Sequence, residues 1–234
     1  MPANQLRIVV KEALADVADA AAIHVRAAAA EAIAARGRFR IALAGGSTPR
    51  ALYPRLVEGV DWTRATVFFG DERAVGPTDP QSNYRMAQET LLGPAAVPAD
   101  NVHRWRAEDP DLDAAARDYE RLLPPAFDVL LLGIGPDGHT ASLFPGAPTL
   151  DERTRRVVPS DSPFPPPRRL TITPPVIAAA RRTAVIVAAR EKAGIVQRAL
   201  EGPRDPHQLP VQLALSDVWI LDRAAASKLT PAPA

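Results

Sequence analysis

The sequence predicts a Rossmann-like α/β protein, in which a mostly parallel, twisted sheet carries helices on both faces. Strand-like and helix-like segments alternate almost throughout the 234 residues, and the strand segments are near-continuous apolar runs. Alternation is typical of βαβ units, and apolar runs are typical of strands that are buried on both faces. The length suits one domain of this class, and we expect residues 1–234 to form it.

The first half of the chain begins with an apolar strand and an alanine-rich segment of high helix propensity. The next strands end in glycine-containing turns, and a proline at the first helical position suits the helix that follows the second strand. In chain order we expect strand Leu6–Val10, helix Glu12–Ala35, strand Phe39–Ala44, a helix from Pro49 to Val57, strand Thr66–Phe69, helix Ser82–Leu92 and a short strand beginning at Val102.

The second half continues the alternation, and its clearest strand is the apolar run Phe127–Leu132. The proline-rich segment Ser162–Pro167 is expected to be a stiff surface loop and not a boundary between domains. The other expected elements are helix Leu112–Leu123, strand Arg155–Val158, strand Arg169–Thr173, helix Val176–Arg181, strand Ala184–Ala188, helix Ala193–Leu200 and strand Val218–Leu221.

The composition argues against several classes of protein. The chain has 28 basic and 27 acidic residues, so its charge offers no electrostatic basis for binding nucleic acid or an anionic membrane. The absence of cysteine excludes disulfides and cysteine nucleophiles, and the histidines show no metal-ligand spacing. Because the sequence has neither a signal-peptide pattern nor a membrane-spanning run, we expect a cytoplasmic protein without metal or cofactor.

The turn after the second strand has the residues of an anion-binding loop. Gly45 and Gly46 expose backbone N–H groups, Ser47 and Thr48 add hydroxyl donors, and Pro49 suits the first turn of a helix. The N-terminus of a helix favours an anion, which predicts a phosphate site here. The alternative is an ordinary capped turn between a strand and a helix.

Three other strand ends carry polar residues that are expected to meet this turn at one edge of the sheet. Asp71 and Arg73 follow the third strand, where Arg73 offers a guanidinium fork for a phosphate and Asp71 a carboxylate to orient a histidine or bind a sugar hydroxyl; the alternative is a solvated loop. Asp137 and His139 follow the strand Phe127–Leu132, where a histidine can take and return protons near neutral pH. Lys192 lies near the start of a helix, which is unfavourable for a cation unless it meets an anion; the alternative is an ordinary surface lysine.

The glycines of the same loop invite a different interpretation. Gly133, Gly135 and Gly138 follow the G-x-G-x-x-G pattern of dinucleotide-binding turns. However, Pro136 removes a backbone donor inside the loop, and Pro145 limits any following helix to one or two turns. We therefore expect a small ligand and not a dinucleotide at this loop.

Taken in order, these motifs resemble the 6-phosphogluconolactonase family. The similarity spans essentially the whole chain and includes AGGSTPRALYPRL, FFGDERAVGPTDPQSNYRMAQETLL, LLLGIGPDGHTASLFPG, RRLTITPPVI, EKAG and WILDRAAA. The resemblance implies the α/β fold that this family shares with glucosamine-6-phosphate deaminases. It also implies hydrolysis of 6-phospho-D-glucono-1,5-lactone to 6-phosphogluconate, the second step of the oxidative pentose phosphate pathway.

The resemblance also implies roles for individual residues. His139 is expected to activate water as a general base, while Asp137 and Asp71 shape and polarise the site. The residues expected to hold the substrate and its phosphate are Ser47, Thr48, Arg73, Asn83, Arg85 and Lys192. For the oxyanion that develops on the lactone, we expect backbone amides around Gly135–Gly138 as donors.

Two positions depart from the family pattern. Ala178 follows Ile177 where the family commonly has asparagine, and Ala188-Ala189 precede Arg190 where the family often has glycine. The second departure bears on how Lys192 is presented to a ligand.

Two other functions remain open at this stage. The first is an amino-sugar-phosphate deaminase or isomerase. The families that it would resemble carry a glutamate shortly after the DGH segment, and Phe144 stands at that position here. The second is a sugar-phosphate sensor without catalysis. We expect a monomer, with an oligomer as the alternative, and a phosphorylated sugar lactone as the only partner.

Overall fold

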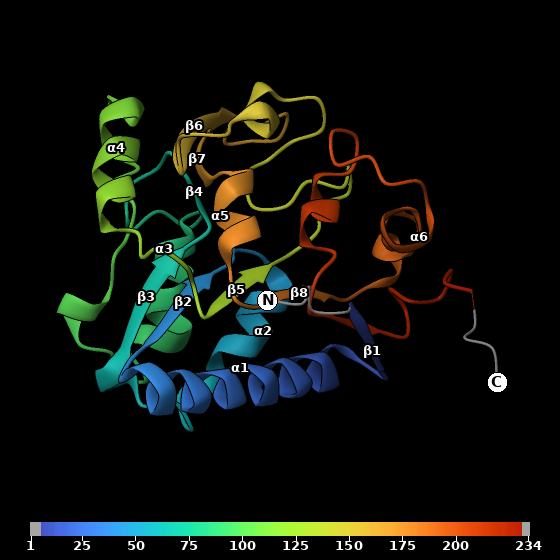
Figure 1. Cartoon of the computed structure of the whole chain (residues 1–234), viewed down its shortest axis with the longest axis horizontal. Helices are drawn as coiled ribbons and strands as arrows, with labels where there is room; N and C mark the ends of the chain where they lie inside the picture. The colour runs from blue at the N-terminus through green and yellow to red at the C-terminus, as the bar shows by residue number, and fades with distance from the viewer. Residues whose placement is uncertain (1–5, 231–234) are drawn as a thin grey trace.

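The computed structural model describes residues 6–230, and its centre is a sheet of six parallel strands (Figure 1). The strand order is β1-β9-β8-β5-β2-β3, and every neighbouring pair is parallel. The strands are β1 (Arg7–Lys11), β2 (Phe39–Leu43), β3 (Ala65–Phe69), β5 (Val129–Leu132), β8 (Thr183–Val187) and β9 (Val218–Asp222). The prediction of a mostly parallel sheet is confirmed.

The strand order places the point where the sheet reverses its direction of growth between β2 and β5. From β2 the chain adds β3 on one side, whereas β5 lies on the other side of β2 and is followed outward by β8 and β9. In open α/β sheets, ligands bind at such a switch point, beyond the carboxyl ends of the strands. The glycine turns after β2 and after β5 both lie there.

Helices cover the larger sheet. The longest, α1 (Leu14–Arg36), ends at Gly37 in a left-handed C-cap and, together with α2 (Ser47–Leu52), contacts strands of the sheet. The others are α3 (Asn83–Ala87), α4 (Leu112–Leu122), α5 (Pro174–Ala179) and α6 (Ala193–Glu201). Within residues 6–230, no helix has the length and apolar character needed to cross a membrane.

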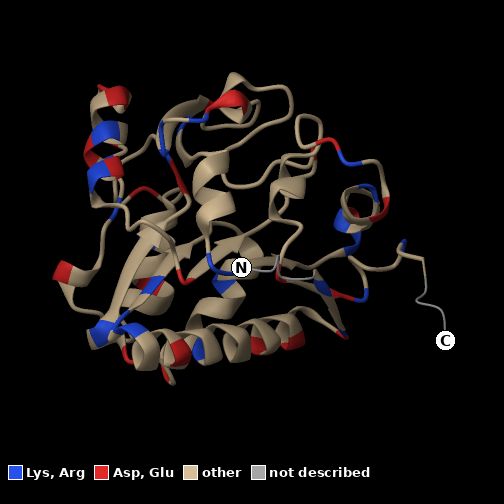
Figure 2. Cartoon of the chain, viewed as in Figure 1, with Lys and Arg blue, Asp and Glu red and all other residues tan. Residues whose placement is uncertain are grey.

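Charge follows this layering. In Figure 2 the charged residues lie on the outer helices and the loops, whereas α5 and most of the central strands carry none. The strands β5, β8 and β9 are buried along their whole length, and they are apolar except for Thr183 at the start of β8 and Asp222 at the end of β9. Burial on both faces explains why these strands lack the alternating pattern of a half-exposed sheet.

A second sheet was not predicted from the sequence. It has three antiparallel strands in the order β4-β7-β6, namely β4 (Asp71–Arg73), β7 (Arg168–Ile172) and β6 (Val157–Asp161). The segment Asp71–Arg73 was expected to be the end of the preceding strand and not a strand of its own. The N–H of Gly70 donates to the carbonyl of Leu43 in β2, and the carbonyl of Gly70 accepts from the N–H of Ile172 in β7, so the chain passes from one sheet to the other at this residue.

Two further expectations need correction. Val102 forms a single bridge to Val67 and no strand, because the chain turns through a short 3₁₀ segment just before it. The helix expected over Ser82–Leu92 is α3 followed by a wider π-helical turn, Gln88–Leu92. The loop Ser162–Pro167 connects β6 with β7 as a surface segment, as predicted.

Candidate functional site

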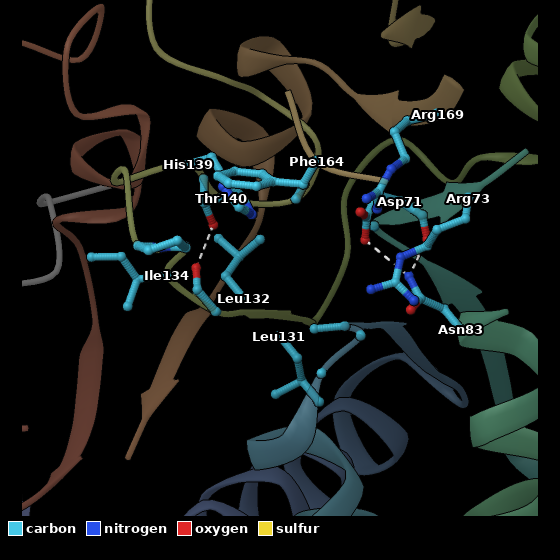
Figure 3. A pocket seen from close by; sticks show the side chains of 18 of the residues that line it. Asp71, Arg73, Asn83, Leu131, Leu132, Ile134, His139, Thr140, Phe164 and Arg169 are labelled. Carbon is cyan, nitrogen blue, oxygen red and sulfur yellow. Dashed lines mark hydrogen bonds between the residues drawn. The ribbon is translucent and has the colours of Figure 1, made fainter. Parts of the chain in front are cut away.

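A cavity of about 380 Å³ opens at the carboxyl edge of the larger sheet, at the switch point between β2 and β5 (Figure 3). Both sheets contribute to it. Its chemically functional side chains are those of Asp71, Arg73, Asn83, His139, Thr140, Phe164, Arg169 and Lys192, and Gly45 and Gly46 contribute backbone. The prediction that the polar strand ends converge at one edge is therefore confirmed.

A smaller cavity of about 150 Å³ adjoins the larger one. The two share Gly45, Gly46 and Lys192, but only the smaller one is lined by Ser47 and Thr48. No side chain caps the N-terminus of α2 at this point, so the backbone donors of its first turn are not occupied by a capping group. The smaller cavity thus combines free amides, two hydroxyls and one ammonium group.

His139 and Asp137 form a close pair in the loop after β5. Nδ1 of His139 lies 2.6 Å from Oδ1 of Asp137, and both side chains are only partly exposed. Because a carboxylate can only accept, this contact favours the hydrogen on Nδ1, and in the neutral imidazole Nε2 then keeps its lone pair. This geometry leaves Nε2 able to take a proton from a molecule in the cavity.

The electrostatics of Asp137 agree with this arrangement. Partial burial would raise the pKa of its carboxyl group, but the hydrogen bond and the charge interaction with His139 outweigh burial and hold the pKa below its ordinary value. Asp137 therefore stays ionised near neutral pH and keeps one tautomer of His139 in place.

The glycines of this loop allow the backbone to pass close to other groups. A Cβ atom on Gly135 would overlap the imidazole ring of His139, and Gly138 has a φ of +94° that side chains rarely adopt. No helix follows Gly138; the chain continues as turns up to Gly146. A dinucleotide-binding turn requires that helix, so the arrangement agrees with the exclusion of a dinucleotide.

The expectation that amides around Gly135–Gly138 serve an oxyanion is wrong for two of them. The N–H of Gly135 donates to the carbonyl of His139 at 2.8 Å, and the N–H of Gly138 donates to the carbonyl of Gly135 at 3.1 Å. These donors close the tight turn that presents His139. They are not free for a ligand.

Lys192 lies in the short 3₁₀ segment before α6, and its side chain contacts the loop after β5. Its Nζ donates to the carbonyl of Ile134 at 2.9 Å. Burial lowers the pKa of its ammonium group, while the carboxylates of Glu191 and Asp137 act in the opposite direction. Lys192 thus places a partly desolvated cation between the two cavities.

Asp71 does not orient the histidine, which was one role considered for it. Its Oδ2 accepts from the hydroxyl of Ser142 at 2.7 Å, and its Oδ1 accepts from Nδ2 of Asn83 at 3.2 Å. Asn83 also packs on Gly45, where any Cβ atom would overlap its amide group. Asp71 and Asn83 therefore form a fixed polar wall between the two sheets.

Glu72 is buried beside this wall and serves the fold. Its carboxylate accepts from the N–H groups of Arg73, Asn83 and Tyr84 and from the hydroxyl of Ser82, at 2.8 to 3.0 Å. Burial raises the pKa of this carboxyl group, and the backbone donors oppose that effect. The result is a side chain that binds β4 to the start of α3.

Two arginines of the smaller sheet line the larger cavity. Arg73 and Arg169 are opposite each other in the pairing of β4 with β7. The Nε of Arg169 donates to the carbonyl of Pro166 at 2.8 Å, and burial lowers the pKa of its guanidinium while Asp71 raises it. Arg169 was not singled out from the sequence. Little in the sequence indicated that Arg169 lines the site, because Arg168 precedes it and only the alternation of side chains along the strand decides which of the two faces inward.

Arg85 lies outside this cavity, contrary to the expectation that it frames the substrate. Its guanidinium pairs with Glu89 at 2.7 Å and donates to the carbonyl of Thr78 at 2.9 Å. Helix α3 directs Asn83 inward at its first residue and Arg85 outward two residues later. Within residues 6–230 there is also no cluster of three or more His, Asp or Glu side chains that could hold a metal ion.

Comparisons with known proteins agree with this geometry. Residues 12–220 match the family described as glucosamine-6-phosphate isomerases/6-phosphogluconolactonase. The 6-phosphogluconolactonase of Mycobacterium tuberculosis is 40% identical over 218 residues, which cover 85% of this chain and 88% of that protein. Among solved structures, 6-phosphogluconolactonase from Trypanosoma cruzi is 28% identical, with a TM-score of 0.85 and 98% of both chains covered. A monomeric glucosamine-6-phosphate deaminase is 25% identical, with a TM-score of 0.81 over 96% of this chain and 99% of that one.

Proposed function

Because the chain belongs to the glucosamine-6-phosphate isomerase/6-phosphogluconolactonase family, we propose that it hydrolyses 6-phospho-D-glucono-1,5-lactone to 6-phosphogluconate. The observation that carries this proposal is the Asp137–His139 pair, which faces a cavity continuous with an anion-binding turn. A base and a phosphate cradle on one cavity match a substrate with a hydrolysable bond at one end and a phosphate at the other.

The smaller cavity suits the phosphate. Ser47 and Thr48 offer hydroxyl donors, the first turn of α2 offers amides, and Lys192 supplies positive charge. Binding the phosphate there directs the remainder of the substrate into the larger cavity, next to His139. The binding energy of the distant phosphate can then be used to orient the reacting carbonyl.

The chemical step is the attack of water on the lactone carbonyl. In our proposal Nε2 of His139 removes a proton from water as the oxygen attacks, and Asp137 stabilises the imidazolium that forms. The ring C–O bond then breaks, and the imidazolium returns its proton to the leaving oxygen. The positive charge of Arg73 and Arg169 stabilises the negative charge on the carbonyl oxygen, since the amides of Gly135 and Gly138 are occupied.

Deamination of an amino sugar phosphate is the alternative reaction on this fold. Phe144 argues against it, because its buried ring packs 4.7 Å from the His139 ring at the position where a proton-transferring carboxylate would be needed. A hydrocarbon ring cannot transfer protons between carbon atoms.

We also propose that the protein acts in the cytoplasm as a monomer with a single domain. One continuous cluster of buried side chains includes Val157 and Leu170 of the smaller sheet together with the strands of the larger one, which supports a single domain. The nearly balanced charge supports a small-molecule partner and gives no reason to expect nucleic acid.

A coupled assay tests the proposed reaction. The lactone is generated in place, and its loss is followed against the spontaneous rate, with glucosamine 6-phosphate as the competing substrate. We expect acceleration of lactone loss and no ammonia release. A protein that binds 6-phosphogluconate but leaves the spontaneous rate unchanged would be a sensor, and ammonia release would identify a deaminase.

A further inference from the structure

Phe164 lines the larger cavity although it lies on the exposed loop between β6 and β7 (Figure 3). Phe164 is 38% exposed, so part of its ring is open to the cavity that it lines. The ring centroid is 5.9 Å from that of His139 and 6.5 Å from that of Phe144. The three rings form an aromatic wall, by which we mean His139, Phe144 and Phe164.

The loop that carries Phe164 is held at both ends. The N–H of Ser162 donates to the carbonyl of Pro167 at 2.7 Å, and the hydroxyl of Ser162 accepts from the N–H of Phe164 at 3.0 Å. Arg169 binds the carbonyl of Pro166 at 2.8 Å. These bonds and the run of prolines already restrict the loop. Fixing the Phe164 ring when a ligand binds therefore costs little conformational entropy.

The other members of the wall have roles of their own. Phe144 is buried and fills space behind His139, and His139 presents Nε2 to the cavity. Phe164 has neither role, because it is not buried and has no polar atom. What it offers to the cavity is a flat apolar face close to the base.

We infer that Phe164 is a specificity-determining residue that packs against one face of the substrate ring and favours the cyclic lactone over the open-chain acid. This inference rests on the proposed function. The C–H face of a six-membered lactone is apolar and nearly flat around the ester, so it can stack on an aromatic ring. The open-chain product lacks this face and carries a hydrated carboxylate, so it gains less from the same contact.

Four variants test this inference in the full-length protein. Phe164→Ala removes the ring, Phe164→Leu keeps apolar bulk without the flat face, and Phe164→Tyr keeps the flat face. Pro163→Ala is the matched control, because Pro163 is an exposed neighbour in the same loop that does not line the cavity. For each variant KM and kcat are measured with the phosphorylated lactone, and Ki is measured with 6-phosphogluconate as product inhibitor.

For Phe164→Ala we expect KM for the lactone to rise about 5- to 10-fold, while Ki for 6-phosphogluconate changes less than about 2-fold. Phe164→Leu should fall near Phe164→Ala, and Phe164→Tyr and Pro163→Ala near the original protein. Equal increases of KM and Ki, or a fall of kcat with KM unchanged, would overturn the inference, since they indicate a general or structural contribution. If the original protein fails to accelerate lactone loss at all, the proposed function fails instead.

Discussion

The loops of the larger sheet and the strands of the smaller sheet line the same cavity but hold their polar groups in opposite ways. On the larger sheet, Nε2 of His139 and the hydroxyls of Ser47 and Thr48 have no hydrogen-bond partner within residues 6–230. On the smaller sheet, both oxygens of Asp71 and both of Glu72 accept from protein donors. In our proposal the first region therefore binds the phosphate and transfers the proton, and the second supplies shape and charge.

The difference has a structural cause. Parallel strands end in loops at one edge, where side chains meet solvent or a ligand and can stay unpaired. The antiparallel strands of the smaller sheet run beside the cavity and are largely buried, so their carboxylates are paired within the protein. Substitutions in the two regions should accordingly separate loss of activity from loss of stability.

Replacing His139 by alanine should have the largest effect. If Nε2 is the base, we expect kcat/KM for the lactone to fall by about 10²- to 10⁴-fold, with the unfolding transition little changed because the ring is only partly buried. The comparison with a matched exposed histidine, His207→Ala, removes general effects of the substitution. Activity of the His139 variant equal to that of the original protein would contradict the assignment of the base to this loop.

The loop after β5 was the part of the candidate site that the sequence pattern predicted best. An apolar run followed by glycines, an aspartate and a histidine is a local pattern, so Asp137 and His139 could be singled out from the sequence, whereas their hydrogen bond was seen only in the structure. The turn at Gly45–Thr48 was also predictable, because its glycines and hydroxyl residues directly follow an apolar strand and precede a proline. The roles of these residues still rest on the resemblance and on the proposal above.

The smaller sheet could not be predicted in the same way. Its strand β4 has only three residues, all charged, and its partner β7 lies almost a hundred residues later. Pairing between such distant segments depends on tertiary contacts, which leave no local period in the sequence. Arg169 and the contact of Asp71 with Ser142 were missed for this reason, and Arg85 was misplaced because the direction of a side chain on a short helix depends on its packing.

Replacing Glu72 by glutamine tests the second region. The glutamine amide can accept at one oxygen only, and its NH₂ group would face N–H groups that the carboxylate of Glu72 accepts from in the original protein. Because those donors would lose their acceptor, we expect the free energy of unfolding to fall by about 1–3 kcal/mol. Chemical denaturation measures this loss. We expect kcat of the folded variant to stay within about 3-fold of the original, because Glu72 does not line the cavity.

Glu89→Gln is the control for this substitution. Glu89 is an exposed carboxylate close to α3 that pairs with Arg85 across one helical turn, and such a pair contributes about 0.5 kcal/mol. If Glu72→Gln were no more destabilising than Glu89→Gln, or if it abolished activity in a stably folded protein, the division between a reactive and a structural region would be wrong.

The smallest expected effect is at Ala189, which departs from the family pattern and precedes Lys192. Ala189 has φ +91° and ψ 145°, a conformation in which a Cβ atom is strained and which glycine adopts readily. Relief of that strain outweighs the extra freedom of glycine in the unfolded chain, so Ala189→Gly should raise the free energy of unfolding by about 1 kcal/mol.

Ala188→Gly is the matched control. Because Ala188 lacks a positive φ, this substitution should lower the free energy of unfolding by about 0.5–1 kcal/mol. The N–H of residue 189 keeps its bond to Asp222 in both variants, so KM for the lactone should stay unchanged. A loss of stability in Ala189→Gly, or a changed KM, would mean that the alanine itself holds Lys192 in place and that this loop of the larger sheet is structural as well as reactive.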